Sequence, residues 1–266
     1  MLLLFDHPLS PYAQKCRIAL REKGVTFEAR LLAGVGAGSG LEPAFTAASP
    51  RAEVPALVDG DVRVFDSTII LDYVEERWPE PPLLPASPAD RARVRMIEEA
   101  MDTHYEPLNW GLGEVHFFRR ATGELAQKLT DRAAAQAAAW RRWLERQLGD
   151  RLWFDGERFG RGDLSVAPYL NGSRGFGIEP EPGSRLAAWL ARANERPSVT
   201  AIAAEAASFV AGSAGGMGAV ADAVAKGLFK REYRDHRLEW MIRSGGLPVV
   251  LEGLERGNLR FTREFD

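Results

Sequence analysis

Residues 10–24 read SPYAQKCRIALREKG and decide how the fold begins. Ser10 suits the N-cap of a helix and Pro11 its first turn, because serine accepts a backbone N–H there and proline has none to lose. The apolar run Leu2–Phe5 precedes this segment and is typical of a buried strand. Apolar residues then recur at helical spacing, and a glycine follows where the helix should end: Tyr12, Cys16, Ala19, Leu20 and Gly24. The sequence therefore predicts a strand that leads directly into a capped helix.

The residues up to 80 continue this alternation of strand and helix patterns. Phe27–Leu32 alternates between apolar and polar residues, which predicts a second strand. Val54–Val58 and Val62–Phe65 flank the sequence Asp-Gly-Asp, which is typical of a β-hairpin. A further helix is expected to open at Asp66. The predicted order is β-α-β followed by β-β-α, and we expect it to form a domain over residues 1–80.

The chain changes character after this point. Residues 79–85 are rich in proline and cannot continue a helix, so we expect a linker over 81–88. Residues 89–210 have helical periodicity throughout, and we expect kinks at Pro107 and at Gly111-Leu-Gly113. The fold class is therefore α/β plus all-α.

The last part of the chain, residues 211–266, is predicted to be a helical C-terminal extension. It opens with a glycine-rich spacer, and a long helix is expected over Ala219–Arg243. A short helix over Val249–Glu255 and an extended end over Arg260–Phe265 complete the expectation.

Composition excludes several classes of protein. The chain has 266 residues and a formal net charge of −3, which does not suit a dedicated nucleic-acid binder. Its one cysteine excludes an internal disulfide, a Cys-x-x-Cys redox pair and a thiolate zinc site, and its few, scattered histidines lead us to expect no metal. No apolar run approaches the roughly 18 residues that span a membrane. We expect a protein of the reducing cytoplasm that binds neither membranes nor nucleic acids.

Three segments place polar groups at the start of a helix or strand. Ser10 is either a helix cap alone or a hydroxyl that stabilises a thiolate at the positive end of the helix. Val54-Pro55 is either an ordinary edge-strand proline or a cis bond that frees the Val54 backbone for an extended peptide ligand. Asp66 and Ser67 either cap a helix or bind the two charged ends of an α-amino-acid group.

Taken together, these segments resemble the thioredoxin-like N-terminal domain of cytosolic glutathione transferases, and the likeness extends over about residues 1–210. The resemblance implies that Ser10 activates the glutathione thiol, as in the serine-type classes. It implies that Val54-Pro55 pairs with the cysteinyl backbone of glutathione, and that Asp66 and Ser67 hold its γ-glutamyl end.

Two departures from the family pattern bear on the site. The residue that usually holds the glycyl carboxylate has no obvious equivalent, and Arg51 is the best local cation for that role. Cys16 lies on the apolar stripe of the first helix, away from the catalytic position, so we expect a buried, inert thiol.

The resemblance also covers the helical part. The family's second substrate lies over the glutathione sulfur, against the first long helix of the helical domain. Each candidate for that pocket could instead belong to the core or to a dimer interface: Tyr12, His104, Tyr105 and Trp110. The sequence FGRGDL at residues 159–164 resembles the family's capping box, with Gly160 where Ser or Thr is usual.

Two functions remain open at this point. The resemblance implies a homodimeric glutathione transferase, with glutathione as cosubstrate and a small hydrophobic electrophile as second substrate. The sequence does not choose among conjugation, dehalogenation, ether cleavage and isomerisation. The alternative is a non-catalytic protein that keeps the transferase fold and uses residues 211–266 to bind a partner.

Overall fold

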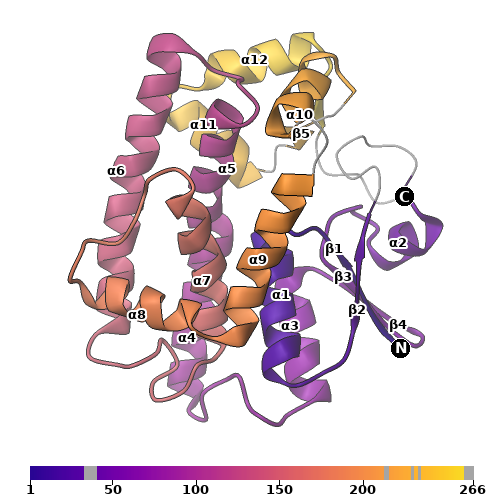
Figure 1. Ribbon diagram of the computed structural model, residues 1–266, viewed down its shortest axis with the longest axis vertical. Helices are drawn as coiled ribbons and strands as arrows, with labels where there is room; N and C mark the ends of the chain where they lie inside the picture. The colour runs from indigo at the N-terminus through magenta and orange to yellow at the C-terminus, as the bar shows by residue number, and fades with distance from the viewer. Residues whose placement is uncertain (33–40, 213–215, 229–230, 233–234, 261–266) are drawn as a thin grey trace.

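The computed structural model describes residues 1–32, 41–212, 216–228, 231–232 and 235–260. Its N-terminal part contains a four-stranded sheet in the order β2-β1-β3-β4 (Figure 1). β1 pairs in parallel with β2 and antiparallel with β3, and β3 forms a hairpin with β4. The strands are β1 (Leu2–Asp6), β2 (Glu28–Leu31), β3 (Ala56–Asp59) and β4 (Val62–Phe65). The predicted order of elements along the chain, β-α-β followed by β-β-α, is confirmed, with one additional helix between its two halves.

Helices cover both faces of this sheet. α1 (Pro11–Glu22) and α3 (Ser67–Arg77) lie on the face that meets the helical part of the chain, and α2 (Pro43–Ala48) lies on the other (Figure 1). The sequence analysis missed α2. A small core beneath α2 joins Phe5 of β1 to Phe45, whereas α1 and α3 contribute to the main hydrophobic core.

The helical part begins at Pro88, after the proline-rich segment. It forms a layer of helices against α1 and α3 (Figure 1). Its helices are α4 (Pro88–Ala100), the π-helix η1 (Met101–Tyr105), α5 (Glu106–His116), α6 (Gly123–Leu148), α7 (Arg161–Arg174), α8 (Arg185–Asn194) and α9 (Pro197–Gly212).

The break in the first long helix lies one turn earlier than expected. In η1 the N–H of Glu106 donates to the carbonyl of Met101, five residues before it. The next N–H in this pattern would come from Pro107, which has none, so the carbonyl of Asp102 lacks a helical partner. That carbonyl accepts instead from the Tyr12 hydroxyl at 2.8 Å. Pro107 therefore interrupts the helical hydrogen bonds at the point where Tyr12 of α1 contacts the helix.

The helix does not break at Gly111-Leu-Gly113, where a kink was expected, because α5 runs through both glycines. Gly111 instead gives space to a side chain from the extension. A Cβ atom at this position would overlap the indole ring of Trp240, since the atom Cη2 would lie only 2.8 Å away. The glycine lets α11 pack closely on α5.

The extension contains three helices and a short two-stranded parallel sheet in its described part. The expected single helix over Ala219–Arg243 is wrong, because α10 ends at Ala225 and a strand follows it. The helix expected over Val249–Glu255 is confirmed as α12, while residues 261–265 of the expected extended end lie outside the described residues. The elements are α10 (Gly216–Ala225), β5 (Arg231–Glu232), α11 (Asp235–Arg243), α12 (Leu247–Glu255) and β6 (Leu259–Arg260).

The extension is joined to the helical part by polar contacts as well. Arg237 of α11 donates to the carboxylate of Glu106 at 2.6 Å, and both side chains are buried. The Trp240 indole N–H donates to Gln136 of α6. Because a buried ion pair and a fitted aromatic ring fix α11, this segment packs as part of the helical layer.

Candidate functional site

The three predicted segments meet at one edge of the sheet. Phe5, Ala56 and Phe65 are directly opposite one another on β1, β3 and β4. β1 and β4 run toward this edge and β3 starts from it. The turn to Ser10, the segment before Ala56 and the start of α3 therefore lie side by side.

Ser10 is the N-cap of α1, as predicted. Its hydroxyl oxygen accepts the backbone N–H of Ala13 at 3.3 Å, and its side chain is half-buried. The hydroxyl proton is not needed for this contact, so it is available to a ligand. The positive end of the α1 dipole lies at the same place, and both features favour an anion there.

The Val54-Pro55 peptide bond is cis, as one of its two interpretations proposed. Among the described residues, none is hydrogen-bonded to the backbone N–H or C=O of Val54. The neighbouring Glu53 is held in place, because its backbone N–H and C=O both bond to the Ser49 hydroxyl at 3.1 and 2.9 Å. Val54 thus offers a donor and an acceptor to an extended peptide, in the manner of an added strand.

Asp66 and Ser67 form the start of α3. Asp66 accepts the Thr68 N–H at 2.9 Å and has a φ of 72°, a conformation that costs a non-glycine residue of order 1–3 kcal/mol. Strain of this kind is found most often at ligand sites. The Ser67 side chain is buried, yet no described residue is hydrogen-bonded to its hydroxyl. The Asp66 carboxylate can therefore accept a hydrogen bond from a polar ligand, and the Ser67 hydroxyl can donate one to it.

The two remaining N-terminal candidates behave differently. Arg51 forms an ion pair with Glu53 at 3.0 Å, so its charge is already balanced by a carboxylate. Cys16 is buried, its thiol donates to the Ser67 carbonyl at 3.7 Å, and burial raises the pKa of the thiol well above its usual value. The expected burial of the thiol is confirmed, and the raised pKa agrees with the expectation that it is inert.

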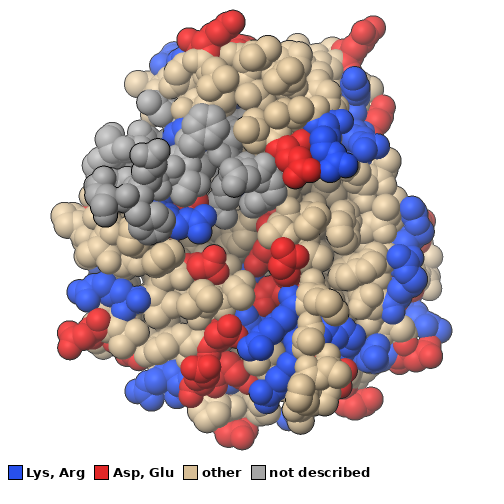
Figure 2. Space-filling model, turned by 180° about the vertical axis from the view of Figure 1, so that it is seen from behind, with Lys and Arg blue, Asp and Glu red and all other residues tan. Residues whose placement is uncertain are grey.

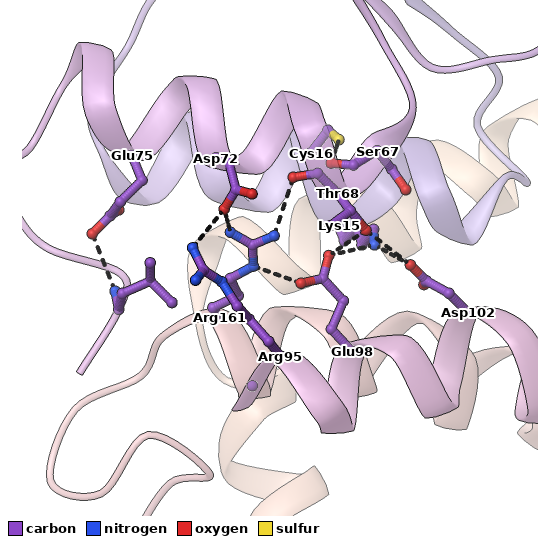
Figure 3. A network of polar contacts seen from close by, with 12 residues as sticks. Lys15, Cys16, Ser67, Thr68, Asp72, Glu75, Arg95, Glu98, Asp102 and Arg161 are labelled. Carbon is purple, nitrogen blue, oxygen red and sulfur yellow. Dashed lines mark hydrogen bonds and ion pairs between the residues drawn. The ribbon is translucent and has the colours of Figure 1, made fainter. Parts of the chain in front are cut away.

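A buried polar cluster lies directly below the start of α3 and was not predicted. Figure 3 shows Lys15 of α1 between the carboxylates of Glu98 and Asp102, with a distance of 2.7 Å to Glu98. Arg161 of α7 donates to the other oxygen of Glu98 at 2.6 Å and to the Thr68 carbonyl at 3.1 Å. The cluster thus ties α3, next to Ser67, to the helical layer.

Electrostatics explain how these charges tolerate burial. Burial alone would raise the pKa of Glu98, but Lys15 and Arg161 outweigh it and hold that pKa at about 2. Burial alone would lower the pKa of Lys15, but Asp102 and Glu98 raise it above its usual value. Charged residues inside helical patterns usually face solvent, so a single sequence gave no signal for this cluster.

The four second-substrate candidates lie in different surroundings within the described part of the chain. Tyr105 is fully buried and bonds to the Ser173 hydroxyl at 2.9 Å, so it belongs to the core. Tyr12 is also buried, and its hydroxyl donates to the Asp102 carbonyl. These contacts favour the alternative interpretation of both residues as core, because spacing alone could not show which side of the helix faces inward.

The other two candidates face the helical layer. His104 is exposed on the side of η1 toward α6, with its ring 5.6 Å from that of Trp140. Trp110 is half-buried, and the guanidinium of Arg237 lies 5.2 Å above its ring. Neither side chain contacts the turn that carries Ser10 in the described structure.

Other kinds of site find little support in the described part of the chain. No group of three or more His, Cys, Asp and Glu side chains there is arranged to hold a metal ion. None of the described helices combines the length and apolar character needed to cross a bilayer. On the face shown in Figure 2, acidic and basic side chains are mixed, without one large basic patch.

Comparisons with known proteins agree with this geometry. The family described as glutathione S-transferase, N-terminal domain, matches residues 4–82. A stringent starvation protein A homolog from Coxiella burnetii is 36% identical over 105 residues, which are 40% of this chain and about half (48%) of that protein. Glutathione S-transferase 1 of Dianthus caryophyllus is 31% identical over 180 residues, covering 66% of this chain and 79% of that one.

A solved structure extends the likeness to three dimensions. Rice GST1 in complex with glutathione is 30% identical, with a TM-score of 0.64, and the match covers 76% of this chain and 90% of the rice chain. The thioredoxin-like sheet with its helical partner layer is therefore shared. The chain belongs to the cytosolic glutathione S-transferase superfamily.

Proposed function

We propose that this protein is a serine-type glutathione transferase. The observation that carries the proposal is the edge of the sheet where the Ser10 hydroxyl, the unpaired Val54 backbone and the Ser67 hydroxyl lie together. A tripeptide with a thiol in its middle residue needs this combination: a strand-like partner for its backbone, a donor for its sulfur and a polar corner for its amino-acid end.

Each group has a defined task in this proposal. Ser10 donates its hydroxyl proton to the glutathione sulfur and, with the N-terminus of α1, lowers the pKa of that thiol. Val54 pairs with the cysteinyl backbone beside the cis Pro55. Ser67 donates to the γ-glutamyl carboxylate, and the Asp66 oxygen not used by Thr68 accepts from the ammonium group. The thiolate then attacks a small hydrophobic electrophile.

The glycyl end is the weaker part of the proposed site. Arg51 remains the best cation for that carboxylate, but its partner Glu53 competes for it. Glu53→Gln should therefore tighten glutathione binding, because it frees Arg51 and removes a repulsive charge. Titration of glutathione against both proteins checks this, and an unchanged affinity would remove Arg51 from the site.

The central test compares two serines that cap helices alike. Ser184 accepts the Ala187 N–H at 3.1 Å at the start of α8, as Ser10 does for Ala13 at α1. Each alanine variant should lose about 1 kcal/mol of stability through its cap. Only Ser10→Ala should raise the pKa of bound glutathione, followed by thiolate absorbance, and lower kcat/KM by roughly 10- to 100-fold.

Two results would contradict the proposal. If the wild-type protein neither binds immobilised glutathione nor lowers its thiol pKa, the non-catalytic, partner-binding alternative is favoured. If Ser10→Ala and Ser184→Ala have the same thiol pKa as the wild type, the N–H groups at the start of α1 replace Ser10 as the stabilising donors.

We further propose that the extension serves the helical layer rather than closing over the glutathione site. Gly111→Ala should displace Trp240 and cost about 1–3 kcal/mol. Gly113→Ala is the matched control on the same helix, because a Cβ there meets only Phe117 at an ordinary 3.7 Å. Neither variant should change the thiol pKa of bound glutathione; a change in Gly111→Ala alone would favour a lid.

A homodimer in the cytoplasm completes the proposal. Ile69 on α3 and Met96 on α4 are 54% and 60% exposed, and the two helices are joined by an ion pair between Asp72 and Arg95. Two exposed apolar side chains on neighbouring helices suit a partner subunit. Light scattering should give twice the chain mass, and Met96→Asp should lower it toward one chain.

A further inference from the structure

The turn between β1 and α1 carries a second polar side chain that the proposed function does not use. His7 lies three residues before Ser10, and its carbonyl accepts the Ser10 N–H at 2.9 Å. The imidazole and the Ser10 hydroxyl therefore belong to one rigid turn. The ring is half-buried, so part of it remains open to a ligand.

Hydrogen bonding fixes which ring nitrogen carries the proton. The backbone N–H of Leu9 points at Nδ1 of His7, with 3.2 Å between the two nitrogens. A backbone N–H can only donate, so Nδ1 is the acceptor and the proton of the neutral ring is on Nε2. Burial and the nearby Arg17 lower the pKa of His7 to about 4. The ring is thus a neutral donor through Nε2 at physiological pH.

The charged groups around His7 are already engaged with one another. Arg17 of α1 lies 3.4 Å from Asp6 of β1 and also pairs with Glu205 of α9. The carbonyl of Pro8 accepts from Arg17 at 3.2 Å as well. These contacts hold the guanidinium among oxygen partners and leave the imidazole proton for another acceptor.

The surroundings of the ring are otherwise apolar. The Phe209 ring of α9 packs edge-on against His7, with 4.8 Å between ring centres. Leu9, on the same turn, is 38% exposed. No described residue accepts from Nε2, and this atom is not among the fully buried polar atoms that lack a partner. The imidazole thus offers a donor without a described acceptor, beside the apolar Phe209 ring and on the same turn as Ser10.

We propose that His7 donates a hydrogen bond from Nε2 to an oxygen of the electrophile, and that the preferred second substrates are apolar α,β-unsaturated carbonyl compounds. The inference rests on the proposed transferase function. The thiolate sulfur forms a bond to the β-carbon, and the π-electron pair moves to give an enolate whose charge lies on oxygen. His7 keeps its proton and stabilises that oxygen, and water then protonates the α-carbon.

Two variants and two substrates test the assignment. His7→Phe keeps a ring against Phe209 but removes the donor, while His7→Gln places an amide N–H near the position of Nε2. The exposed Leu9 N–H can bond to water in both. The substrates are a phenyl-substituted enone and benzyl chloride, which has no oxygen. The thiol pKa of bound glutathione is measured for every variant.

His7→Phe should lower kcat/KM for the enone by about 10- to 100-fold, the usual effect of losing a hydrogen bond to a developing charge. Benzyl chloride should change less than about twofold, and His7→Gln should recover part of the enone activity. Equal losses for both substrates, or no loss for either, would overturn the role assigned to His7. The transferase function would still stand in that case if the wild type lowers the thiol pKa of bound glutathione. A wild-type protein that does not lower the thiol pKa would overturn both.

Discussion

The first turn of α7 separates two groups of buried and half-buried carboxylates that are stabilised in different ways. On one side the Arg161 side chain reaches Glu98 and Asp72, between α4 and α3. On the other, the backbone N–H groups of the same turn face Asp155 and Asp163. Glu98 of the first group lies between the cations Lys15 and Arg161, whereas the second group is held mainly by backbone N–H groups.

The second group is the expected capping box in an altered form. Asp163 accepts the Gly160 N–H at 3.0 Å, as predicted, and also the N–H groups of Phe154 and Trp189. Gly160 has no hydroxyl to cap the turn. Asp155 takes that role, because it accepts the N–H groups of Arg161 and Gly162 at 3.2 and 2.7 Å.

The two arrangements have different electrostatic consequences. With Lys15 and Arg161 beside it, Glu98 keeps a pKa of about 2 despite burial. Burial raises the pKa of Asp163 to about 6, and burial together with the charge of Asp163 raises that of Asp155 to about 8. Peptide dipoles at a helix start accept a buried carboxylate but compensate its charge less than a guanidinium does.

The largest effect should come from removing the cation. Arg161→Met leaves Glu98 paired with Lys15 and Asp72 paired with Arg95, but it removes the cation that the two carboxylates share, and breaking a buried ion pair costs about 3–5 kcal/mol. The matched control is Arg243→Met, whose ion pair with Glu239 is largely exposed and should cost less than about 0.5 kcal/mol. Urea unfolding of the three proteins measures both changes.

The function of the cluster can be read from the same variants. Because Arg161 also donates to the Thr68 carbonyl, its loss should loosen the start of α3 and weaken glutathione binding. If Arg161→Met were as stable as Arg243→Met, the shared cation would not be what stabilises Glu98 and Asp72. The proposed difference from Asp155 and Asp163 would then be wrong.

The pH dependence of stability should reveal the second group. Asp155 and Asp163 have pKa values raised from 3.8, so the folded protein holds protons that the unfolded chain releases. Their contribution is complete below about pH 4 and is lost as pH rises toward 8. Glu98, with a lowered pKa, has the opposite sign and loses its contribution as pH falls from 4.5 toward 2.

Urea unfolding between pH 4.5 and 8 isolates this decline. Asp155→Asn should flatten it, because it removes the group with the higher pKa and relieves Asp163. Asp150→Asn, in the same loop, is the control, since Asp150 is 90% exposed and should leave the slope unchanged. A slope that survives in Asp155→Asn would mean that other groups cause it.

Local patterns in the sequence predicted the sheet edge well. The strand before Ser10 and the helix start at Asp66 follow from a few adjacent residues, whereas the cis Val54-Pro55 bond was one of two interpretations that the local sequence left open. Contacts between distant segments were not predictable in this way. Lys15 and Glu98 are 83 positions apart, and nothing near either residue shows that a partner will balance its burial.

Glycines show the same limit. Gly111 was expected to kink the helix, yet its role in the structure is to leave space for the Trp240 ring of the extension. The sequence shows that position 111 lacks a side chain, but the residue that needs this space, Trp240, lies more than a hundred positions further along the chain. Tyr105 shows a related limit, because helical spacing fixes which residues share a face but not which face is buried.

The smallest expected effect concerns Gly160, where the family usually has Ser or Thr. Restoring that side chain with Gly160→Ser should destabilise the protein by about 1–3 kcal/mol rather than improve the cap. The φ of Gly160 is −156°, which any residue adopts, so space alone decides. A Cβ here would overlap the Asp155 carboxylate and lie 2.8 Å from the Leu83 carbonyl.

A double-mutant cycle separates this crowding from a general intolerance of the site. Asp155→Ala alone should cost about 1–2 kcal/mol, because the Gly162 N–H loses its acceptor and the Arg161 N–H keeps the Leu83 carbonyl alone. In the double variant the new hydroxyl can take over the cap once the carboxylate is gone, so the combined loss should be smaller than the sum of the single losses. Additive losses would show that the Leu83 carbonyl alone excludes a side chain at position 160. A Gly160→Ser protein more stable than the wild type would show that Asp155 had not replaced the family's hydroxyl.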